Sequence, residues 1–479
     1  MSIDLLSTHL LYSCFILFVT WMIVSLWKKN SRLPPGPWGY PILGYYPFLT
    51  HTPHLQFTNL AKSYGNVFSF RTVGGTPVVI LNGAKSIKEV FINRSDEFIG
   101  RPVRNNLNAW VSKGYGITQE EGPSWKEQRR FFLQSAKNFG FGKLELEGVI
   151  LQETRHLLND LRETEGQPTD MKYHIAFAAN NVISQVVYSK KYNKTEFKNI
   201  WTELHYMTEI FAGSAIFLVG YFFDLAFWLL PNMRRIQSGR DSIRQITDEI
   251  IREHEKSFDA GNPRDYVDAY LKHMEELKKN GKLEEYSFNK VRLEANVMNI
   301  FFEGTESVSV ATFCLLSELS KRPDVQILIQ NELDSVIGRE RLPSWTDRQN
   351  LPHVVAAFQE LFRVASPFLI TPLYCNFNET TIEGYKIPAR SLIVANLWSI
   401  NIDPLTYPNP EKFDPERFLG KDGKILKHEG PFPFGLGKRS CLAEPLAHRE
   451  IFIFIVSILQ SFKLLPGDTE DTLRVIARD

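Results

Sequence analysis

The longest apolar run of the sequence extends from Leu5 to Trp27, where one histidine, one tyrosine and one cysteine are the only ionisable side chains. About 20 apolar residues are enough to cross a bilayer as an α-helix. No basic cluster precedes the run and no small-residue cleavage site follows it, which argues against a removed signal peptide. Lys28, Lys29 and Arg32 come directly after it, and positive charge marks the cytosolic side of a span. The pattern predicts a single-pass anchor at residues 1–27, with a buried hydrophobic helix as the alternative.

Proline punctuates the next residues, 28–44, which include the run P-P-G-P at 34–37. Proline removes a backbone donor and fixes φ, so such a segment cannot be helical and tends to be stiff and extended. We interpret it as a hinge between the anchor and a single domain over residues 45–479, because no linker interrupts the rest of the sequence.

A short β-rich part precedes a long helical part. Two β-rich runs, 67–70 and 77–80, flank Gly74 and Gly75 and predict a hairpin. Further short strands and a turn are predicted within 366–388. From about residue 84 to 360, apolar positions recur mostly with helical spacing. The sequence therefore predicts a mostly α protein with a small β region near the N-terminus.

Three apolar stretches stand out in the helical part. Residues 291–319 predict a long buried helix, and residues 442–460 predict an amphipathic helix. Residues 210–230 are interrupted by Gly213 and Gly220, which favours a broken segment at a membrane surface over a second span. Packing in the core is the alternative for this last segment.

Composition narrows the function only slightly. The chain has 479 residues, 43% of them hydrophobic, and a formal net charge of +1. It can form a large core, and its balanced charge gives no indication of a nucleic-acid partner. Four cysteines in so long a chain do not make a disulfide framework, which fits a reducing compartment.

The most informative cysteine is Cys441, between a loop with two glycines and two cations and the helix predicted near the C-terminus. A helix N-terminus and nearby cations both favour thiolate over thiol. Gly435 and Gly437 allow a sharp turn and a close approach to a flat partner. Lys438 and Arg439 bring positive charge beside the sulfur. The pattern predicts a soft ligand for a metal or an electrophile, and an inert buried cysteine is the alternative.

Two more sets of residues carry possible chemistry. Trp125 and Arg129 are four apart, on one face of a predicted helix, where the arginine fork suits a carboxylate. An exposed basic helix with a half-buried tryptophan is the alternative. In the central helix, Gly304 allows a close approach, and Glu306 with Ser307 could pass protons or order a water.

The cysteine loop resembles that of the cytochromes P-450, the haem-thiolate monooxygenases, whose pattern is F-x-x-G-x-R-x-C-x-G. The matching residues are Phe434, Gly437, Arg439 and Cys441, with Ala443 in place of the last glycine. The resemblance covers nearly the whole chain and is closest to microsomal drug- and steroid-oxidising members. It implies the mostly α cytochrome P-450 fold and a b-type haem with Cys441 as axial ligand of the iron.

The resemblance also implies roles for the other candidates. Trp125, Arg129 and Arg439 would hold the haem propionates, Gly304 and Phe434 would contact the haem, and Glu306 and Ser307 would relay protons. Ser307 stands where threonine is usual, and Tyr374 stands where many relatives place His or Arg for the second propionate. Glu360, Arg363 and Arg417 match a structural set on the proximal side.

Glu303 replaces a small residue that is expected to face the haem. Fatty-acid ω-hydroxylases of this family carry glutamate there, and it can esterify a haem methyl. A covalent Glu303–haem link is therefore a hypothesis, and pairing of Glu303 with a cation is the alternative. With Glu303, the resemblance assigns Ala365, Ser366 and Ile370 to the substrate pocket.

The implied reaction inserts one oxygen atom of dioxygen into a lipophilic molecule, such as a steroid, fatty acid or xenobiotic, with electrons from NADPH. No dinucleotide-binding motif is present, so the expected donor is NADPH–cytochrome P-450 reductase, with cytochrome b5 as a further partner. Lys126, Arg130 and Lys438 would form its docking face. The expected location is the endoplasmic reticulum membrane, with the catalytic domain in the cytosol.

Three alternatives remain open. The first is an isomerase or dehydratase of the same fold, which needs no reductase. The second is a haem-binding carrier or sensor, suggested by Glu303 and by a tail that leaves the usual pocket-closing hairpin reduced or missing. The third is a cysteine hydrolase with His448 as its base, although nothing orders a triad around that residue.

Overall fold

The computed structural model describes residues 13, 32–102, 106–140, 144–212, 228–229, 233–426 and 430–478. The predicted anchor lies outside the described residues, apart from one position. Of the apolar segment 210–230, residues 213–227 and 230 lie outside them as well. Trp228 and Leu229, which are described, are exposed.

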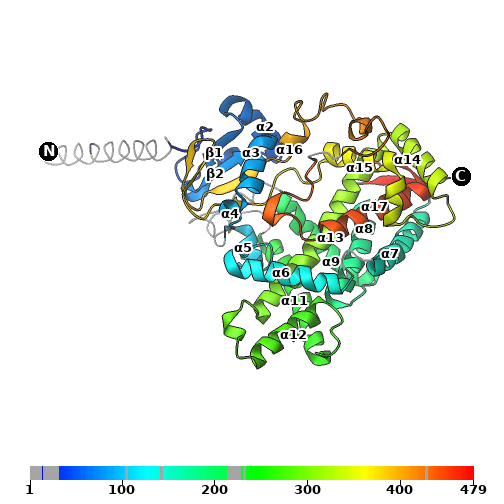
Figure 1. Ribbon diagram of the computed structural model, residues 1–479, viewed down its shortest axis with the longest axis horizontal. Coiled ribbons are helices and arrows are strands. Elements are labelled where there is room, and N and C mark those ends of the chain that lie inside the picture. Colours follow the sequence, from blue (N-terminus) through cyan, green and yellow to red (C-terminus); the bar gives the residue numbers. More distant parts are fainter. Residues whose placement is uncertain are drawn as a thin grey trace, which may run out of the picture.

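The β region is a four-stranded sheet in the order β1-β2-β6-β3, seen beside the helices in Figure 1. Its strands are β1 (Val67–Arg71), β2 (Pro77–Leu81), β3 (Tyr374–Cys375) and β6 (Leu392–Ala395). Strands β1 and β2 pair antiparallel, with Phe68 opposite Ile80, so the predicted hairpin is confirmed. Apolar residues are buried on both faces of the sheet, which fits nearly continuous apolar strands. Smaller pairs are β4 (Thr380–Ile382) with β5 (Tyr385–Ile387), and β7 (Phe462–Pro466) with β8 (Leu473–Ala477).

Helices make up most of the described chain, as predicted. The long ones are α6 (Gly122–Asn138), α7 (Leu144–Glu163), α8 (Met171–Tyr188), α9 (Lys194–Ala212), α11 (Met233–Ser257), α12 (Tyr266–Lys279), α13 (Lys290–Ser320), α14 (Pro323–Val336), α15 (Pro352–Ala365) and α17 (Glu444–Ser461). The short ones are α2 (Pro53–Tyr64), α3 (Gly83–Lys88), α4 (Ser95–Phe98), α5 (Leu107–Ser112) and α16 (Trp398–Asn401).

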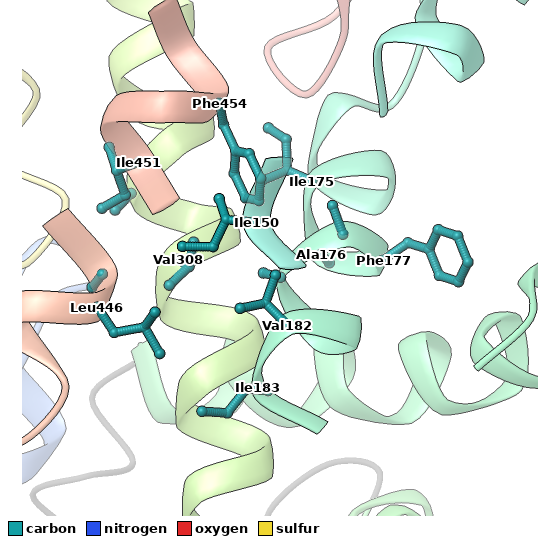
Figure 2. Close-up of a cluster of buried hydrophobic side chains, with 14 of the residues drawn as sticks. Ile150, Ile175, Ala176, Phe177, Val182, Ile183, Val308, Leu446, Ile451 and Phe454 are labelled. Carbon is teal, nitrogen blue, oxygen red and sulfur yellow. The ribbon is translucent and has the colours of Figure 1, made fainter. Parts of the chain in front are cut away.

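Helix α13 is the centre of the core and matches the predicted buried helix. Val308 of α13, Ile183 of α8 and Leu446 of α17 lie in one apolar cluster, shown in Figure 2. Burying each such side chain contributes roughly 1.5–3 kcal/mol. Among the described residues, α13 is also the one helix long and apolar enough to cross a membrane, yet 56% of its most apolar window is buried inside the protein. Packing in the core explains its composition.

The segment predicted as a hinge is partly built into this body. Leu33 is 7% exposed, and the Ser69 hydroxyl and N–H donate to the carbonyl oxygens of Pro34 at 2.6 Å and Pro35 at 2.9 Å. The folded domain therefore begins before residue 45. At the other end, the tail forms the hairpin β7–β8, so it does not lack one. Whether a pocket-closing hairpin is reduced stays a prediction.

Candidate active site

Cys441 lies in a loop that leads into α17. Its N–H donates to the carbonyl oxygen of Phe434 at 2.9 Å, which closes the loop around a single helical turn at Gly437–Arg439. Helix α17 begins at Glu444, two residues later than predicted, with Ala443 as its N-cap. The Cys441 side chain is exposed in the protein alone, so the sulfur is accessible to a ligand.

The two glycines of this loop serve different purposes. Both have a φ of 73°. A Cβ on Gly437 would lie 1.8 Å from the carbonyl oxygen of Phe91, whereas one on Gly435 would meet nothing within 4 Å. The N–H of Lys438 also donates to Ser95 Oγ at 3.2 Å. Gly437 therefore lets the loop pack on its own protein, and only Gly435 leaves open space.

The pKa of the Cys441 thiol depends mainly on the protein atoms around it. Although the sulfur is open on one side, the protein atoms around it displace water and raise the pKa of its thiol to about 11. The Ala443 N–H and the charge of Arg129 oppose this shift without cancelling it, and Glu303 adds to it. In the absence of a metal ion the protein atoms thus favour the thiol, and the thiolate ligand stays a prediction. A metal ion bound to sulfur would favour the thiolate at neutral pH.

Trp125 and Arg129 lie on α6 next to the cysteine loop. Arg129 Nη2 donates to the carbonyl oxygen of Ser440 at 2.9 Å, and the Arg439 guanidinium lies 3.8 Å from the centre of the Trp125 ring. Trp125 is 3% exposed, and its Nε1 has no hydrogen-bond partner among the residues that the structure describes. The predicted propionate-binding residues are thus close together, with a buried N–H left to donate.

Arg101 also belongs to this group and was missed by the sequence analysis. It is 7% exposed, and its guanidinium lies 4.2 Å from the centre of the Tyr374 ring. It donates to the carbonyl oxygens of Thr118 at 3.0 Å and Leu373 at 2.7 Å. No local pattern marks Arg101, because its neighbours come from distant segments of the chain.

Arg101, Arg129 and Arg439 form a cationic cluster, and the carboxylates nearest to it, on Glu121 and Glu303, act on its charges without forming an ion pair with them. Every side-chain hydrogen bond found for them goes to a backbone carbonyl, and none of the three forms an ion pair within the described ranges. Burial first, and then the charge of Arg101, lowers the pKa of Arg439 to about 8. Buried cations need anionic partners. The two propionates of a haem would supply them, and Trp125 Nε1 would supply a further donor, so these residues fit the expected cofactor.

Tyr374 lies in the same cluster. It is 4% exposed, its ring is 4.7 Å from that of Phe91, and its phenol interacts with the charges of Arg129 and Arg439. A phenol can donate one hydrogen bond to a carboxylate. Its contact with the second propionate stays a prediction.

Glu303 faces the space beside Cys441. Its side chain is exposed in the protein alone, and its charge raises the pKa of the Cys441 thiol. Although the side chain is open on one side, the protein atoms around it displace water and raise the pKa of Glu303 to about 7. The charge of Arg101 and a contact with Thr118 oppose this shift. Glu303 forms no ion pair with a cation among the described residues, but Arg101 is near enough to act on its charge, so the alternative of cation pairing stays open. Ser307, one turn later, donates its hydroxyl to the Glu303 backbone oxygen.

Glu306 points in another direction, toward α8 and α9. It is 3% exposed, and neither carboxyl oxygen is within hydrogen-bonding distance of a described group. Burial raises its pKa to about 7, while Thr208 of α9 and Lys172 of α8 are near enough to lower it. Glu306 and Ser307 are therefore not joined directly, and a proton passing between them would need water.

Gly304 is explained by helix packing. A Cβ at this position would lie 2.8 Å from Cγ1 of Ile183, so the missing side chain lets α8 approach α13. The predicted close approach is confirmed, with α8 as the partner. Contact of Gly304 with haem stays a prediction.

Glu360, Arg363 and Arg417 come together as predicted. Arg363 Nη2 lies 2.7 Å and Arg417 Nε 3.3 Å from the same oxygen of Glu360. Arg363 is 1% exposed and also donates to the carbonyl oxygens of Asn401 and Pro410. The three charges thus tie α15 to the chain that leads to the cysteine loop.

The residues predicted to line the substrate pocket have different surroundings. Ser366 is 3% exposed, and its hydroxyl donates to Arg363 O and accepts from Asn401 Nδ2, each at 2.7 Å, so it belongs to the cap of α15. Ala365 packs on the main core, and Ile370 packs on the sheet. The structure does not bring the Ser366 hydroxyl into contact with Glu303.

The predicted docking residues Lys126, Arg130 and Lys438 are all exposed. Lys438 forms an ion pair with Asp96. Phe434, four residues earlier in the same loop, instead packs against α17, with its ring centre 4.4 Å from that of His448. Lys126 and Arg130, four residues apart on α6, form no ion pair within the residues that the structure describes, although the hydrogen bond with Lys438 and then the charge of Lys126 lower the pKa of Asp96.

Neither a hydrolase triad nor a free metal cluster is found in the described part of the chain. Burial lowers the pKa of His448 to about 4, and its nearest carboxylate, on Glu444, is 3.8 Å away. His254, Asp265 and Asp268 have ligand atoms within 4.8 Å of one another. They already pair internally, His254 with Asp265 at 2.9 Å and Asp268 with Arg264 at 2.6 Å.

The amino-acid sequence is similar to those of known proteins. The family model described as "Cytochrome P450" matches residues 34–476. Mouse (Mus musculus) cytochrome P450 2C44 is 36% identical over 461 residues, covering 94% of this chain and 91% of that protein. Human (Homo sapiens) cytochrome P450 2C8 is 34% identical, with 95% and 93% covered. Rat (Rattus norvegicus) cytochrome P450 2U1 is 33% identical, with 93% and 88% covered.

Proposed function

Because the chain belongs to the cytochrome P450 family of haem-thiolate monooxygenases, which bind haem b, we propose that it inserts one oxygen atom of dioxygen into a lipophilic small molecule, with electrons from NADPH. One observation carries the proposal for this chain. An accessible cysteine lies beside two buried arginines, Arg101 and Arg439, and the half-buried Arg129, none of which forms an ion pair with a carboxylate in the described residues. A porphyrin with two propionates satisfies both requirements.

In this proposal Cys441 Sγ binds the haem iron, and Arg101, Arg129 and Arg439 bind the propionates with Trp125 Nε1. The haem supplies the iron that activates dioxygen, and a thiolate ligand favours O–O cleavage. The loop hydrogen bond from Cys441 N–H to Phe434 O, at 2.9 Å, holds the sulfur in place. Glu360 with Arg363 and Arg417 keeps the approach to the loop rigid.

Glu306 is proposed to hold the proton for the reaction at its carboxyl oxygens. A pKa of about 7 keeps a substantial fraction of the acid protonated at neutral pH. A proton donor works best when its pKa is near the working pH. Ser307, the next residue of α13, would order the water that receives the proton.

Electrons are proposed to come from NADPH–cytochrome P-450 reductase, with cytochrome b5 as a second donor, at Lys126 and Arg130. We place the protein at the endoplasmic reticulum membrane, with a single-pass anchor at 1–27 and the domain in the cytosol. Trp38 and Ile42, just after the anchor, are 68% and 64% exposed. Exposed aromatic and apolar side chains suit the membrane interface.

The substrate class is tested with a panel of lauric acid, testosterone and 7-ethoxycoumarin. We expect at least one to shift the spin state of the ferric haem. With reductase, NADPH and ¹⁸O₂, that compound should gain one labelled oxygen atom. Product without NADPH would favour the isomerase alternative, and saturable binding without product would favour the carrier alternative.

The Glu303–haem ester is a separate part of the proposal. It is supported by the exposure of the Glu303 side chain and by its closeness to Cys441, on whose pKa its charge acts. After turnover, acidic acetone should leave haem on the wild-type chain and remove it from Glu303→Gln. Complete extraction from both proteins would contradict the ester and leave the monooxygenase proposal intact.

A further inference from the structure

A cavity lies between α9 and α11, the helices labelled below the centre of Figure 1. Its volume is about 370 Å³, and it shares no lining residue with the site around Cys441. Three isoleucines form its apolar wall, and its polar lining comes from Asn199, Thr202, Glu203 and Ser242. A volume of this size, with apolar walls and a few polar groups, is typical of a small-molecule site.

Glu203 gives the cavity its chemical character. Its Oε2 is buried and has no hydrogen-bond partner in the described part of the chain. The helix opposite carries Gly239, where a Cβ would lie 2.9 Å from that oxygen. Because Gly239 has no side chain, the Glu203 carboxylate has room to lie against α11. A buried carboxylate oxygen without a partner is costly, and a bound cation would offset that cost.

The lining of the cavity carries one charged side chain, that of Glu203. No cation is among the lining residues. Glu196 comes three residues before Asn199 on α9, and Glu249 comes three residues after Ile246 on α11, and both glutamates are exposed. Residues three apart on a helix are neighbours. Burial, and then the charges of Glu196, Glu253 and Glu249, raise the pKa of nearby Tyr192 to about 12, although its hydrogen bond with Tyr188 lowers it.

We propose that the cavity between α9 and α11 is a binding site for a small amphipathic organic cation. The ammonium group would lie against the Glu203 carboxylate, and its hydrocarbon part would lie on the isoleucines. The site is separate from the haem site and does not depend on which substrate is oxidised.

The test uses benzyltrimethylammonium, whose quaternary nitrogen cannot bind iron. Binding is measured by calorimetry on the haem-loaded full chain, with 4-phenylimidazole bound to the iron so that the haem site is filled. We expect one saturable site, weakened at least fivefold in Glu203→Gln. The matched control Glu196→Gln removes the same charge outside the cavity and should change affinity less than twofold.

A second variant keeps the test independent of the charge change. Ser242→Phe fills the cavity and leaves Glu203 intact, so it should also weaken binding at least fivefold. The proposal is overturned by absence of binding to the wild type, by equal affinity in Glu203→Gln, or by equally tight binding of the neutral analogue neopentylbenzene. The reduced carbon monoxide spectrum of each variant reports the haem site separately, so failure here leaves the proposed function untouched.

Discussion

Buried positive charge distinguishes this site at the scale of single residues. Arg101 and Arg439 are 7% and 8% exposed, yet their guanidinium groups donate to neutral carbonyl oxygens. Removing buried charges from water costs several kcal/mol unless anions compensate. The carboxylates of a bound cofactor would therefore contribute to the stability of the protein as well as to the affinity of the cofactor.

Arg101 should be as important for binding haem as Arg129 and Arg439, which the sequence motifs indicated. Arg101→Leu removes one charged hydrogen-bond donor, worth about 1.5–3 kcal/mol, so haem should leave about 10- to 100-fold faster. Transfer of haem to apomyoglobin measures this rate. Arg101→Lys should recover part of the loss, and Arg390→Leu, which removes a nearby arginine paired with Glu121, should change the rate little. Wild-type transfer rates in Arg101→Leu would contradict the assignment.

Glu306 should control how turnover depends on pH. Its raised pKa of about 7 means that the neutral, proton-donating form is present at low pH and is lost as pH rises through 7. We expect kcat of the wild type to fall above pH 7. Glu306→Gln should lower kcat by about 10²-fold and flatten the profile, because general acids typically contribute that much or more.

The measurement for Glu306 is product formation and hydrogen peroxide release from pH 6 to 8.5, with the best substrate of the panel. Glu306→Asp retains a carboxyl group and should restore part of the rate. A Glu306→Gln enzyme with wild-type kcat would exclude proton delivery by this residue.

At the scale of elements, the cysteine loop is held by contacts with the segment that carries Phe91 and Ser95. Gly437 makes this possible, because any side chain there would collide with a backbone oxygen at 1.8 Å. A backbone oxygen in a packed segment cannot move away as the end of a flexible side chain can.

The loop offers a matched pair of variants to test this contact. Gly437→Ala should displace the loop and abolish most haem binding, since it adds a collision to a left-handed φ that costs alanine about 1–2 kcal/mol. Gly435→Ala has the same φ of 73° with open space around it, so it should cost only the conformational part. The haem content and the Tm of each variant are measured. Equal effects would show that packing on Phe91 is unimportant.

Local patterns predicted most of the elements and the residues that lie within one motif. Periodicity predicted α13, the β1–β2 hairpin and α17 to within two residues, since each depends on neighbouring positions. The loop of Cys441 was predictable because its residues are contiguous. Arg101 was not, because its partners Thr118, Leu373 and Tyr374 come from distant segments. The desolvation that raises the pKa of the Cys441 thiol was not predictable either, because a dipole argument leaves out the protein atoms that displace water.

At the scale of the whole molecule, the sheet region and the helical body form one folded domain whose described part begins at residue 32. The N-terminal residues 32–36 add to the sheet, since Pro34 and Pro35 accept hydrogen bonds from Ser69. This packing predicts that residues 32–36 stabilise the folded domain.

Two truncations distinguish this stabilising role from that of the predicted anchor. Removal of residues 1–31 should release the protein from lipid vesicles and leave the haem spectrum unchanged. Removal of residues 1–44 should also destabilise the domain by about 3 kcal/mol, because it exposes the contacts of buried Leu33 and deletes two hydrogen bonds to Ser69. Vesicle sedimentation and Tm are the measurements. Equal Tm values for the two truncations would restore the predicted boundary at residue 45.

The central claim is that the sulfur of Cys441 binds haem iron, and the absorption spectrum of the reduced protein under carbon monoxide tests it most directly. We predict the red-shifted Soret band of a thiolate-ligated haem for the wild type, and its loss in Cys441→Ala and Cys441→His, the latter with the band of a histidine-ligated haem. A wild type without the red-shifted band, or a Cys441→Ala protein that keeps it, would contradict the claim.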